Sequence, residues 1–403
     1  MSKSRALIVG MGVSGLAAAK RLREIGWEPV IVERAAERRS AGYFIALFGT
    51  GLATAQRMDV LDAIGSRDDP TTVSYDVDRR GRRRRTPGFP DVPGSPRVVL
   101  RGDVESAFHD TVAPHTDIRY GTTPTTLQEH TGGVDVTLRT TTGEEATETT
   151  ERFDLVVGAD GLRSTVRRLA FGPDTQYTKP MNHIIATAFL KEQVPGLRHQ
   201  DGLTFSEPGR SAWVFPFANH QPGVLFNYRT RNENAQFSRP PAESLRRAFG
   251  PAPTGPVLDH LIGQFGQADD FLFDSTHQVL MPTWHTDRIV LLGDAAWCMT
   301  LYSGMGASTG MAGADLLGTV LQRNPGQIPR ALREWEQRLR PFIATEQKAV
   351  HSVGLQMFVP QTRRDIALRA INQKLVSSPL TARVMKIVMT SALKHKSIDI
   401  AAP

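Results

Sequence analysis

The chain has 403 residues, a net charge of +7 and one cysteine, and 40% of its residues are hydrophobic. This composition is typical of a soluble globular protein of one or two domains. It excludes an internal disulfide framework and a cysteine-rich metal site, and no apolar stretch is long enough to span a bilayer. The arginine run at 82–85 lies among glycine and proline, which favours a solvated loop over a nucleic-acid patch, and a cytoplasmic location is the expectation.

The first residues predict one strand–helix–strand unit. The apolar run RALIV at 5–9 suits a buried parallel strand. Apolar residues then recur at helical spacing from Val13 to Ile25, and Gly26 stands where the helix is expected to stop. A second buried strand, PVIVE, ends at Glu33. This is the βαβ order in which a helix joins two parallel strands.

Three glycines mark the turn between the first strand and the helix. Gly10 permits the tight turn, Gly12 lets the backbone approach a pyrophosphate, and Gly15 lets the helix pack closely on the strand. The first helical residues, Val13 and Ser14, then present N–H groups and a partial positive charge to phosphate oxygens.

Glu33 completes the pattern, because an acid is expected there to accept hydrogen bonds from a ribose. Its charge would repel a 2′-phosphate, so NADP is disfavoured in this site. The stretch therefore predicts dinucleotide binding, with a purely structural glycine turn as the alternative. By itself it does not separate NAD from FAD.

The rest of the chain divides into a mixed region, a sheet-like region and a helical region. The pattern at 51–65 predicts an amphipathic helix that ends at Gly65. Residues 176–284 are mostly strand-like and rich in turns. From Gly306 onward the pattern is helical, and no second G-x-G-x-x-G follows a strand. A separate NAD(P)-binding domain is therefore not expected.

Three further stretches favour FAD. They are VVLRGDVESAF at 98–108, DLVVGADGLRSTVRRLA at 154–170, and RIVLLGDAAWCMTLYSGMGASTGMAGADLLG at 288–318. Together with the opening fingerprint, and in this order, they resemble the flavin-dependent monooxygenases of the p-hydroxybenzoate hydroxylase type. That group includes aromatic hydroxylases and tetracycline-inactivating monooxygenases.

The resemblance implies an α/β fold: a Rossmann-like FAD-binding domain of the GR2 type, an inserted, mostly antiparallel β-sheet substrate domain, and a C-terminal helical region. It places the FAD-binding domain at 1–72, 98–175 and 285–345, the substrate domain at 73–97 and 176–284, and the helices at 346–403. The cofactor-binding residues that it implies are Gly10, Gly12, Val13, Ser14, Gly15, Glu33, Arg34, Arg39, Arg101, Asp160, Asp294, Gly304, Met305, Gly306 and Ala307. For Asp160 the alternative is a cap on the following turn, and for Arg101 a surface position.

The activity implied by the resemblance is hydroxylation or epoxidation of an aromatic or polyketide-like small molecule, with NAD(P)H and O2 as co-substrates and a C4a-hydroperoxyflavin as the oxygen donor. Substrate contacts are expected from Trp213, Phe215, Phe226 and Leu301, although core packing explains the aromatic residues equally well. No catalytic residue is assigned, and no nucleic acid, membrane or metal is expected. The protein is expected to be a monomer or a homodimer.

Four residues depart from the family pattern at positions expected to border the flavin and its substrate: Trp297, Leu301, Ser308 and Gly313. Trp297 and Leu301 motivate an alternative, in which FAD is a structural cofactor for a non-redox cyclisation or another tailoring step. A third possibility, an NAD-linked dehydrogenase, is disfavoured by the later motifs.

Overall fold

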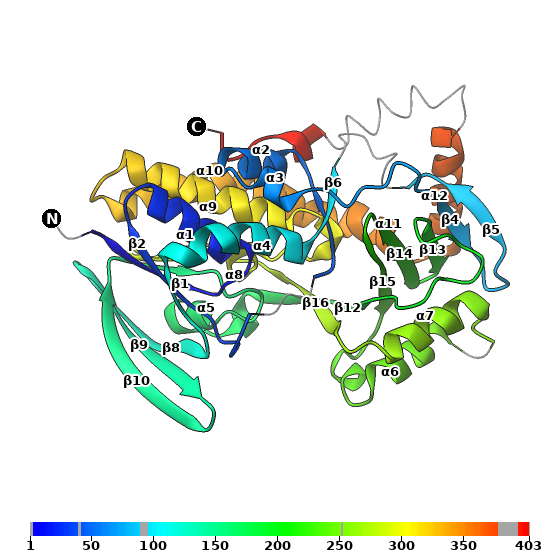
Figure 1. The fold of residues 1–403 in the computed structure, drawn as a ribbon, viewed down its shortest axis with the longest axis horizontal. Helices are drawn as coiled ribbons and strands as arrows, with labels where there is room; N and C mark the ends of the chain where they lie inside the picture. Colours follow the sequence, from blue (N-terminus) through cyan, green and yellow to red (C-terminus); the bar gives the residue numbers. More distant parts are fainter. Residues whose placement is uncertain (1–2, 39–41, 89–95, 251–252, 378–393, 403) are drawn as a thin grey trace.

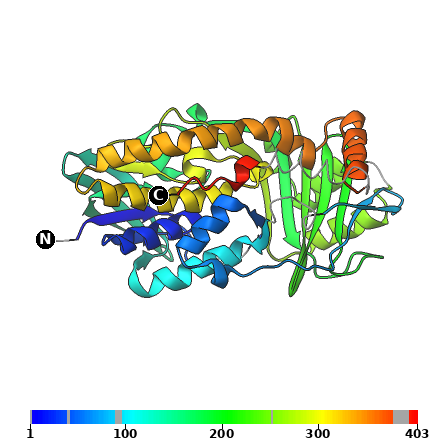
Figure 2. The same ribbon diagram turned by 90° about the horizontal axis from the view of Figure 1, so that it is seen from above.

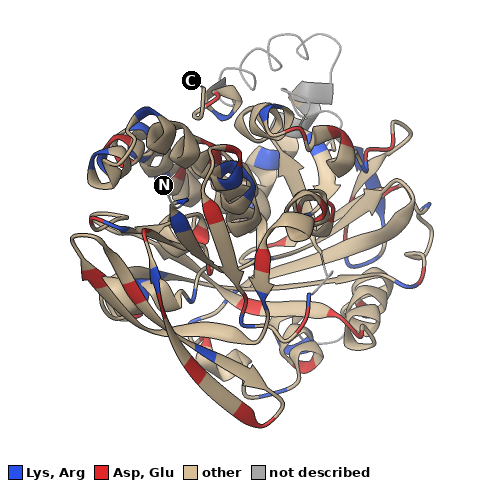
Figure 3. Cartoon of the chain, turned by 60° about the vertical axis from the view of Figure 1, so that its left-hand side comes forward, with Lys and Arg blue, Asp and Glu red and all other residues tan. Residues whose placement is uncertain are grey.

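The structure is a computed structural model that describes residues 3–38, 42–88, 96–250, 253–377 and 394–402. Two sheets dominate it and lie side by side along the longest axis (Figure 1). One is parallel and contains the N-terminal strand, and the other is mostly antiparallel. Acidic and basic residues are interspersed over the ribbon (Figure 3).

The parallel sheet forms because four of its strands are short, mainly apolar runs that are largely buried; the fifth, β7, is a partly exposed edge strand. In spatial order they are β17 (Ile289–Leu291), β11 (Leu155–Gly158), β1 (Arg5–Val9), β2 (Glu28–Val32) and β7 (Asp117–Arg119). The chain leaves β1 toward β2 on one side, and β11 pairs on the other. The carboxyl ends of β1 and β11 are therefore a topological switch point, where ligands bind in open α/β sheets.

Helices cover one face of this sheet and a small antiparallel sheet lies on the other (Figure 1). Helix α1 (Val13–Glu24) packs against α4 (Arg101–Val112) and α9 (Gly306–Arg323), and α10 (Ile328–Ala349) packs on α9. The small sheet contains β8 (Thr122–His130), β9 (Gly133–Thr142) and β10 (Glu145–Phe153). Apolar side chains of β9 and β10 share one core with β1 and α1.

The larger sheet has the order β16 (Phe271–Val279), β12 (Thr178–Phe189), β15 (His220–Arg229), β14 (Arg210–Phe217), β13 (Gly202–Glu207), β4 (Ser74–Val77) and β5 (Arg83–Thr86). Helices α6 (Pro241–Phe249) and α7 (Pro256–Gly266) cover its back face and form a second core. Its front face meets the two-stranded sheet of β3 (Phe44–Leu47) and β6 (Arg97–Leu100).

The C-terminal third connects the two halves, as the view from above shows (Figure 2). After α10 the chain continues through the π-helix η6 (Val350–Gly354) and α11 (Leu355–Phe358) to α12 (Arg363–Ser377), which contacts β13 and β5. The segment 394–402, including η7 (Lys394–Ser397), returns to α2 (Gly49–Arg57). The remaining short elements are α3 (Leu61–Ile64), η2 (Ala113–His115), α5 (Thr165–Ala170), η3 (Asp174–Gln176), η4 (Asn234–Gln236), α8 (Asp294–Trp297) and η5 (Leu301–Ser303).

Two local predictions need correction. The helix predicted at 51–65 is two helices, α2 and α3, because Asp59 takes a positive φ of 53° and breaks the run. The arginine run at 82–85 is exposed, as predicted, but it is not a loop. It doubles back at Gly81 and pairs with β4 as the edge strand β5. Exposed arginines protect such an edge from pairing with another chain.

We expect a matched pair of glycine variants to separate close packing from helix propensity. A Cβ on Gly15 would overlap the Gly10 carbonyl oxygen, whereas a Cβ on Gly263, inside α7, meets nothing within 4 Å. Gly15→Ala should therefore lower the free energy of unfolding by about 1–3 kcal/mol. Gly263→Ala should raise it by about 0.5–1 kcal/mol. Urea denaturation measures both, and equal effects would contradict this packing.

Candidate functional site

The turn between β1 and α1 is built from close backbone contacts. Gly10 has a φ of +102°, and a Cβ there would lie 2.5 Å from the carbonyl oxygen of Ala159, which follows β11. Gly15 packs on Gly10, so α1 begins directly above the end of the sheet. Val13 and Ser14 form the first turn of α1, and its N-cap, Gly12, carries no side chain. The helix N-terminus therefore presents backbone N–H groups at the switch point, which suits phosphate oxygens.

Glu33 joins the end of β2 to this turn. One carboxylate oxygen accepts a hydrogen bond from the Met11 N–H at 3.0 Å, and the other accepts from the Ala35 N–H at 2.8 Å. The carboxylate is thus fixed beside the glycine turn. This is the place in which an acid can accept hydrogen bonds from a ribose.

Arg101 begins α4 and faces the same turn. Its guanidinium lies 2.6 Å from the Glu105 carboxylate and 5.9 Å from the centre of the Tyr43 ring. A Cβ on Gly12 would lie 3.4 Å from an Arg101 nitrogen. Burial works to lower the pKa of Arg101, but Tyr43, Glu105 and Asp294 together raise it, so the cation persists. A fixed positive charge beside a helix N-terminus suits a pyrophosphate.

Asp294 follows β17 and begins α8. Its side chain is accessible to solvent even though protein atoms surround it, so it faces a cleft in the molecule. Burial raises the pKa of Asp294, while the positive charge of Arg101 opposes that shift. A Cβ on Gly306 would lie 3.9 Å from an Asp294 carboxylate oxygen. The carboxylate therefore lies against the glycine-rich turn that opens α9.

That turn runs from η5 into α9. Gly304 is exposed, Gly306 and Ala307 are half-buried, and Met305 is buried in the core. The Met305 N–H donates to the Ser303 hydroxyl oxygen at 3.0 Å, which holds the turn. A second helix N-terminus, of an 18-residue helix, thus borders the cleft beside Asp294.

Asp160 follows β11, but its carboxylate binds the protein. One oxygen accepts from the Ser164 hydroxyl at 2.5 Å, and the other accepts from the Thr165 and Val166 N–H groups at 2.6 and 3.1 Å. Burial raises the pKa of Asp160, and these hydrogen bonds oppose that shift. The geometry supports the role of a cap on α5.

The arginines after β2 are placed unequally. Arg34 is exposed, and Arg39 lies outside the described residues. Arg38, which the sequence analysis missed, donates to the Ser106 hydroxyl of α4 at 2.6 Å and lies in the field of Glu105. The only signal for it was a second basic residue beside Arg39, and the sequence could not rank the two.

The front face of the larger sheet contributes aromatic side chains. Trp213, Phe215 and Leu301 belong to one apolar cluster that also contains Phe44 of β3. Phe226 does not join them: it is fully buried on the back face, with its ring 5.5 Å from that of Phe249 in α6. The expectation for Phe226 is therefore wrong. Side chains alternate along β15, and the register puts Leu225 opposite Trp213 instead.

The expectation that Trp297 borders the flavin is also wrong. Its side chain is buried, with its ring 4.7 Å from Trp284 and 5.7 Å from Trp335. A Cβ on Gly313 would lie 3.1 Å from the Trp297 ring, so the indole occupies space that a larger residue at 313 would need. The departures at 297 and 313 are therefore coupled: the large Trp297 side chain fills core space that the missing side chain of Gly313 leaves.

Ser308 is likewise buried, and it packs against Gly51 of α2. Of the four departures, Leu301 alone is half-buried, and it packs against the cores of both halves. The substitutions at 297, 308 and 313 therefore change core packing rather than the cleft.

The residues in the cleft fit a dinucleotide whose second half carries a sugar-alcohol chain. The N-terminus of α1 and Arg101 suit its phosphates, and Glu33 suits one ribose. Asp294 can accept hydrogen bonds from hydroxyl groups further along, beside the N-terminus of α9. In the described residues no cluster of His, Cys, Asp or Glu could hold a metal ion. The fold and the cleft thus define a dinucleotide-binding flavoprotein.

Residues 3–324 match the family model described as FAD binding domain, and the chain belongs to that family. An uncharacterised protein of Mycobacterium tuberculosis (strain ATCC 25618 / H37Rv) is 31% identical over 358 residues, covering 85% of this chain and 91% of that protein. A flavin-dependent monooxygenase of Legionella longbeachae is 26% identical over 365 residues, covering 86% and 88%. The protein is an FAD-dependent oxidoreductase of the monooxygenase class.

Solved structures share the fold. The tetracycline destructase Tet(55) superposes with a TM-score of 0.80 at 22% identity, over 100% of this chain and 98% of that one. HpxO of Klebsiella pneumoniae, complexed with FAD and uric acid, gives 0.71 at 20% identity over 97% of both chains. Within the described ranges, no helix of this chain combines the length and the apolar character that crossing a membrane requires.

We expect Asp160→Ala to lower the free energy of unfolding of the flavin-free protein by about 1 kcal/mol, because the Thr165 and Val166 N–H groups in the first turn of α5 lose their acceptor while the N-cap Ser164 remains. The flavin content per chain should stay at the wild-type value. Thermal denaturation of apoprotein and the absorbance of purified holoprotein measure the two quantities. Loss of flavin with unchanged apoprotein stability would contradict the capping role.

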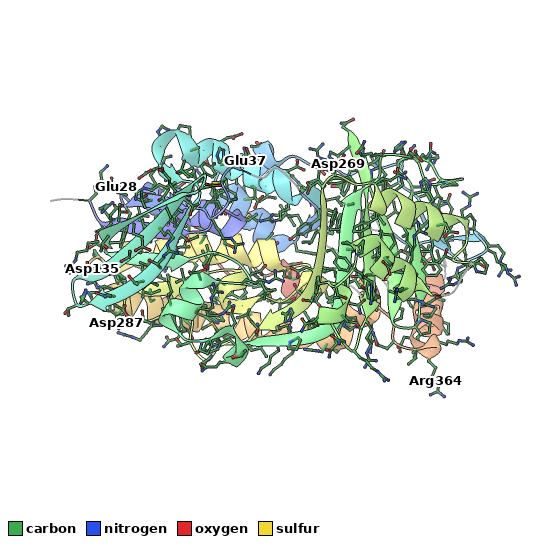
Figure 4. The ribbon with its side chains drawn as sticks, turned by 90° about the horizontal axis from the view of Figure 1, so that it is seen from below. Glu28, Glu37, Asp135, Asp269, Asp287 and Arg364 are labelled. Carbon is green, nitrogen blue, oxygen red and sulfur yellow. The ribbon has the colours of Figure 1, made fainter. Side chains whose placement is uncertain are left out.

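We expect Asp294→Ala to weaken FAD binding by about tenfold or more, because hydrogen bonds to a charged acceptor are lost in a partly dry cleft. Asp287→Ala is the matched control, since Asp287 is exposed at the periphery of the molecule, as the side-chain view shows (Figure 4). Titration of each apoprotein with FAD, followed by flavin fluorescence, gives the dissociation constants. Equal constants for the two variants would remove Asp294 from the site.

Proposed function

We propose that the protein uses NAD(P)H and O2 to hydroxylate or epoxidise a planar aromatic or polyketide-like small molecule. One observation carries this proposal: Leu301, in the short helix η5 directly before the glycine-rich turn that borders Asp294, packs against both the core of the parallel-sheet half and the aromatic cluster. A flat substrate between the turn and the sheet would lie within reach of a bound flavin. When bound, FAD supplies the electron transfer and the activation of dioxygen.

The aromatic cluster supports a planar substrate. The rings of Phe44 and Phe215 are stacked, with centres 4.2 Å apart and planes 8° apart. Trp213 continues the stack, with its ring parallel to Phe215 within 9° at 6.1 Å. Parallel ring faces favour a flat π-system as the ligand, and apolar walls keep water out of the reacting space.

The polar residues of the cleft support the cofactor half of the proposal. Arg101 and the N-terminus of α1 would hold the phosphates, and Asp294 would bind the ribityl hydroxyls. The N-terminus of α9 would stabilise negative charge on the flavin ring. Because Glu33 disfavours a 2′-phosphate in this cleft and no second fingerprint follows a strand, the nicotinamide nucleotide would react from solution.

The test is turnover under labelled oxygen with a panel of flat ligands, including tetracycline, uric acid and hydroxylated anthraquinones. We expect NAD(P)H oxidation to accelerate with at least one of them, and mass spectrometry to find one 18O atom in its product. Conversion without NAD(P)H and without O2 would overturn the proposal and identify a non-redox reaction on the same fold.

A further inference from the structure

The C-terminal segment 394–402 packs on the start of α2 (Figure 1). A Cβ on Gly49 would lie 2.6 Å from the Cα of Ser397, so the two backbones touch at the first residue of α2. The Ile400 N–H donates to the Thr50 hydroxyl at 3.3 Å. These contacts fix the segment on the half of the molecule that contains the parallel sheet.

One side chain of this segment reaches the glycine-rich turn. The Lys396 ammonium donates to the Ser303 carbonyl oxygen at 2.5 Å, at the C-terminal end of η5. It also lies 5.2 Å from the centre of the Phe48 ring, and a Cβ on Gly304 would lie 3.5 Å from that ring. Lysines near a helix C-terminus can satisfy its last carbonyl groups. Lys396 therefore contacts the turn one residue before the exposed Gly304.

The ammonium belongs to a charge pair beside the turn. Its Nζ lies 3.9 Å from a carboxylate oxygen of Glu346 in α10, and His395 bonds the same carboxylate. The Glu346 side chain is 1% exposed. Burial lowers the pKa of Lys396, while the charge of Glu346 opposes that shift. Because a buried carboxylate is costly to leave without a cation, the pair holds Lys396 at this place.

A second contact from the C-terminal third fixes the same short helix. A Cβ on Gly354, in the π-helix η6, would lie 2.5 Å from the Tyr302 carbonyl oxygen, so these two backbones also touch. Two separate parts of the chain after α9 thus hold η5. Because α9 begins at Gly306, shortly after Ser303, a displacement of η5 would shift the N–H groups at the N-terminus of α9.

We propose that Lys396 is a positioning residue for the flavin. It holds the carbonyl end of η5, and its charge offsets the Glu346 carboxylate beside the turn that would face the flavin ring. Without the ammonium, the field at that turn becomes more negative, which disfavours the negative charge that the ring acquires on reduction. The C-terminal segment is thereby part of the cofactor site, although it lies beyond residues 3–324, which match the family model.

The test is the variant Lys396→Met, which removes the charge and the hydrogen bond but keeps an unbranched side chain. We expect FAD binding to weaken at least threefold, as measured by fluorescence titration of the apoprotein. We also expect the midpoint potential of the bound flavin to fall by about 20 mV, which corresponds to a fivefold greater loss of affinity for reduced than for oxidised FAD. Reductive titration against a reference dye measures the potential, and an unchanged potential would overturn the proposal whatever the change in melting temperature.

Two further variants separate the local charge from net charge. Lys396→Arg keeps a cation with hydrogen-bond donors and should keep the wild-type potential. Lys191→Met is the matched control, because Lys191 pairs with Asp269 at 2.7 Å and its side chain is 56% exposed. It should change neither FAD binding nor the potential. A fall in potential equal to that of Lys396→Met would make the effect one of net charge and refute the proposal.

Glu346→Gln alters the other member of the pair and should shift the potential in the opposite direction. It removes a buried negative charge beside the turn, whereas the Lys396 ammonium stays. A downward shift, or none, would contradict the electrostatic role. This variant decides the proposal if Lys396→Met does not retain FAD.

The inference rests on the proposed position of the flavin ring at the N-terminus of α9 and not on the oxygenation of a substrate. Its failure is therefore distinguishable from failure of the proposed reaction, because both readouts are taken without substrate. A lowered potential in Lys396→Met, without 18O incorporation by the wild-type enzyme, would retain this role and refute the reaction. An unchanged potential with 18O incorporation would do the reverse.

Discussion

The architecture depends on the contact between the first turn of α1 and the carbonyl end of β1. Gly15 and Gly10 pack backbone against backbone, and neither position has room for a Cβ. This contact positions the N-terminus of α1 over the sheet, at the switch point between β1 and β11. The carboxyl ends of β2 and β17 open to the same edge, so Glu33 and Asp294 reach one cleft although 261 positions separate them in the chain.

One arginine, Arg101, offsets the negative charge of the acidic side chains around that cleft. Arg101 lies in the field of Glu33, Glu105 and Asp294, and it stacks near Tyr43. Without a nearby cation, the buried Glu105 carboxylate would be costly to keep ionised. Together with the N-terminus of α1, the guanidinium supplies positive potential where phosphates would lie, whereas Glu33 and Asp294 can accept hydrogen bonds from hydroxyl groups. The same residues thus serve the stability of the cleft and its selectivity.

The sequence predicted the parts of the site that depend on local spacing. The βαβ unit, the glycine turn and the acid after β2 are contiguous, so their geometry follows from a single turn. Arg38 was missed because the sequence could not rank it against its basic neighbour. For Asp160 the sequence left a cofactor contact and a cap on the following turn as alternatives, and its hydrogen bonds to the first turn of α5 emerge only with side-chain geometry.

Predictions that depend on packing between elements were less accurate. Phe226 was assigned to the pocket on period-two alternation alone. Alternation shows that successive side chains lie on opposite faces of a sheet, but it does not show which face borders the cleft. Trp297 and Gly313 looked like departures at the flavin, but they compensate each other's volume in the core. Both lie in the stretch 288–318, yet their contact depends on how α8 and α9 pack and cannot be read from spacing alone. The buried Asn227 carboxamide oxygen has no hydrogen-bond partner among the described residues. No sequence pattern indicates this, because it depends on which side chains the neighbouring strands β12 and β14 place beside Asn227.

The most direct test of the central claim is calorimetric titration of the apoprotein with FAD and, separately, with NAD+. The account predicts one FAD bound per chain, with NAD+ neither binding in its place nor competing with it. Tight binding of NAD+ to the apoprotein, with no heat on addition of FAD, would contradict it.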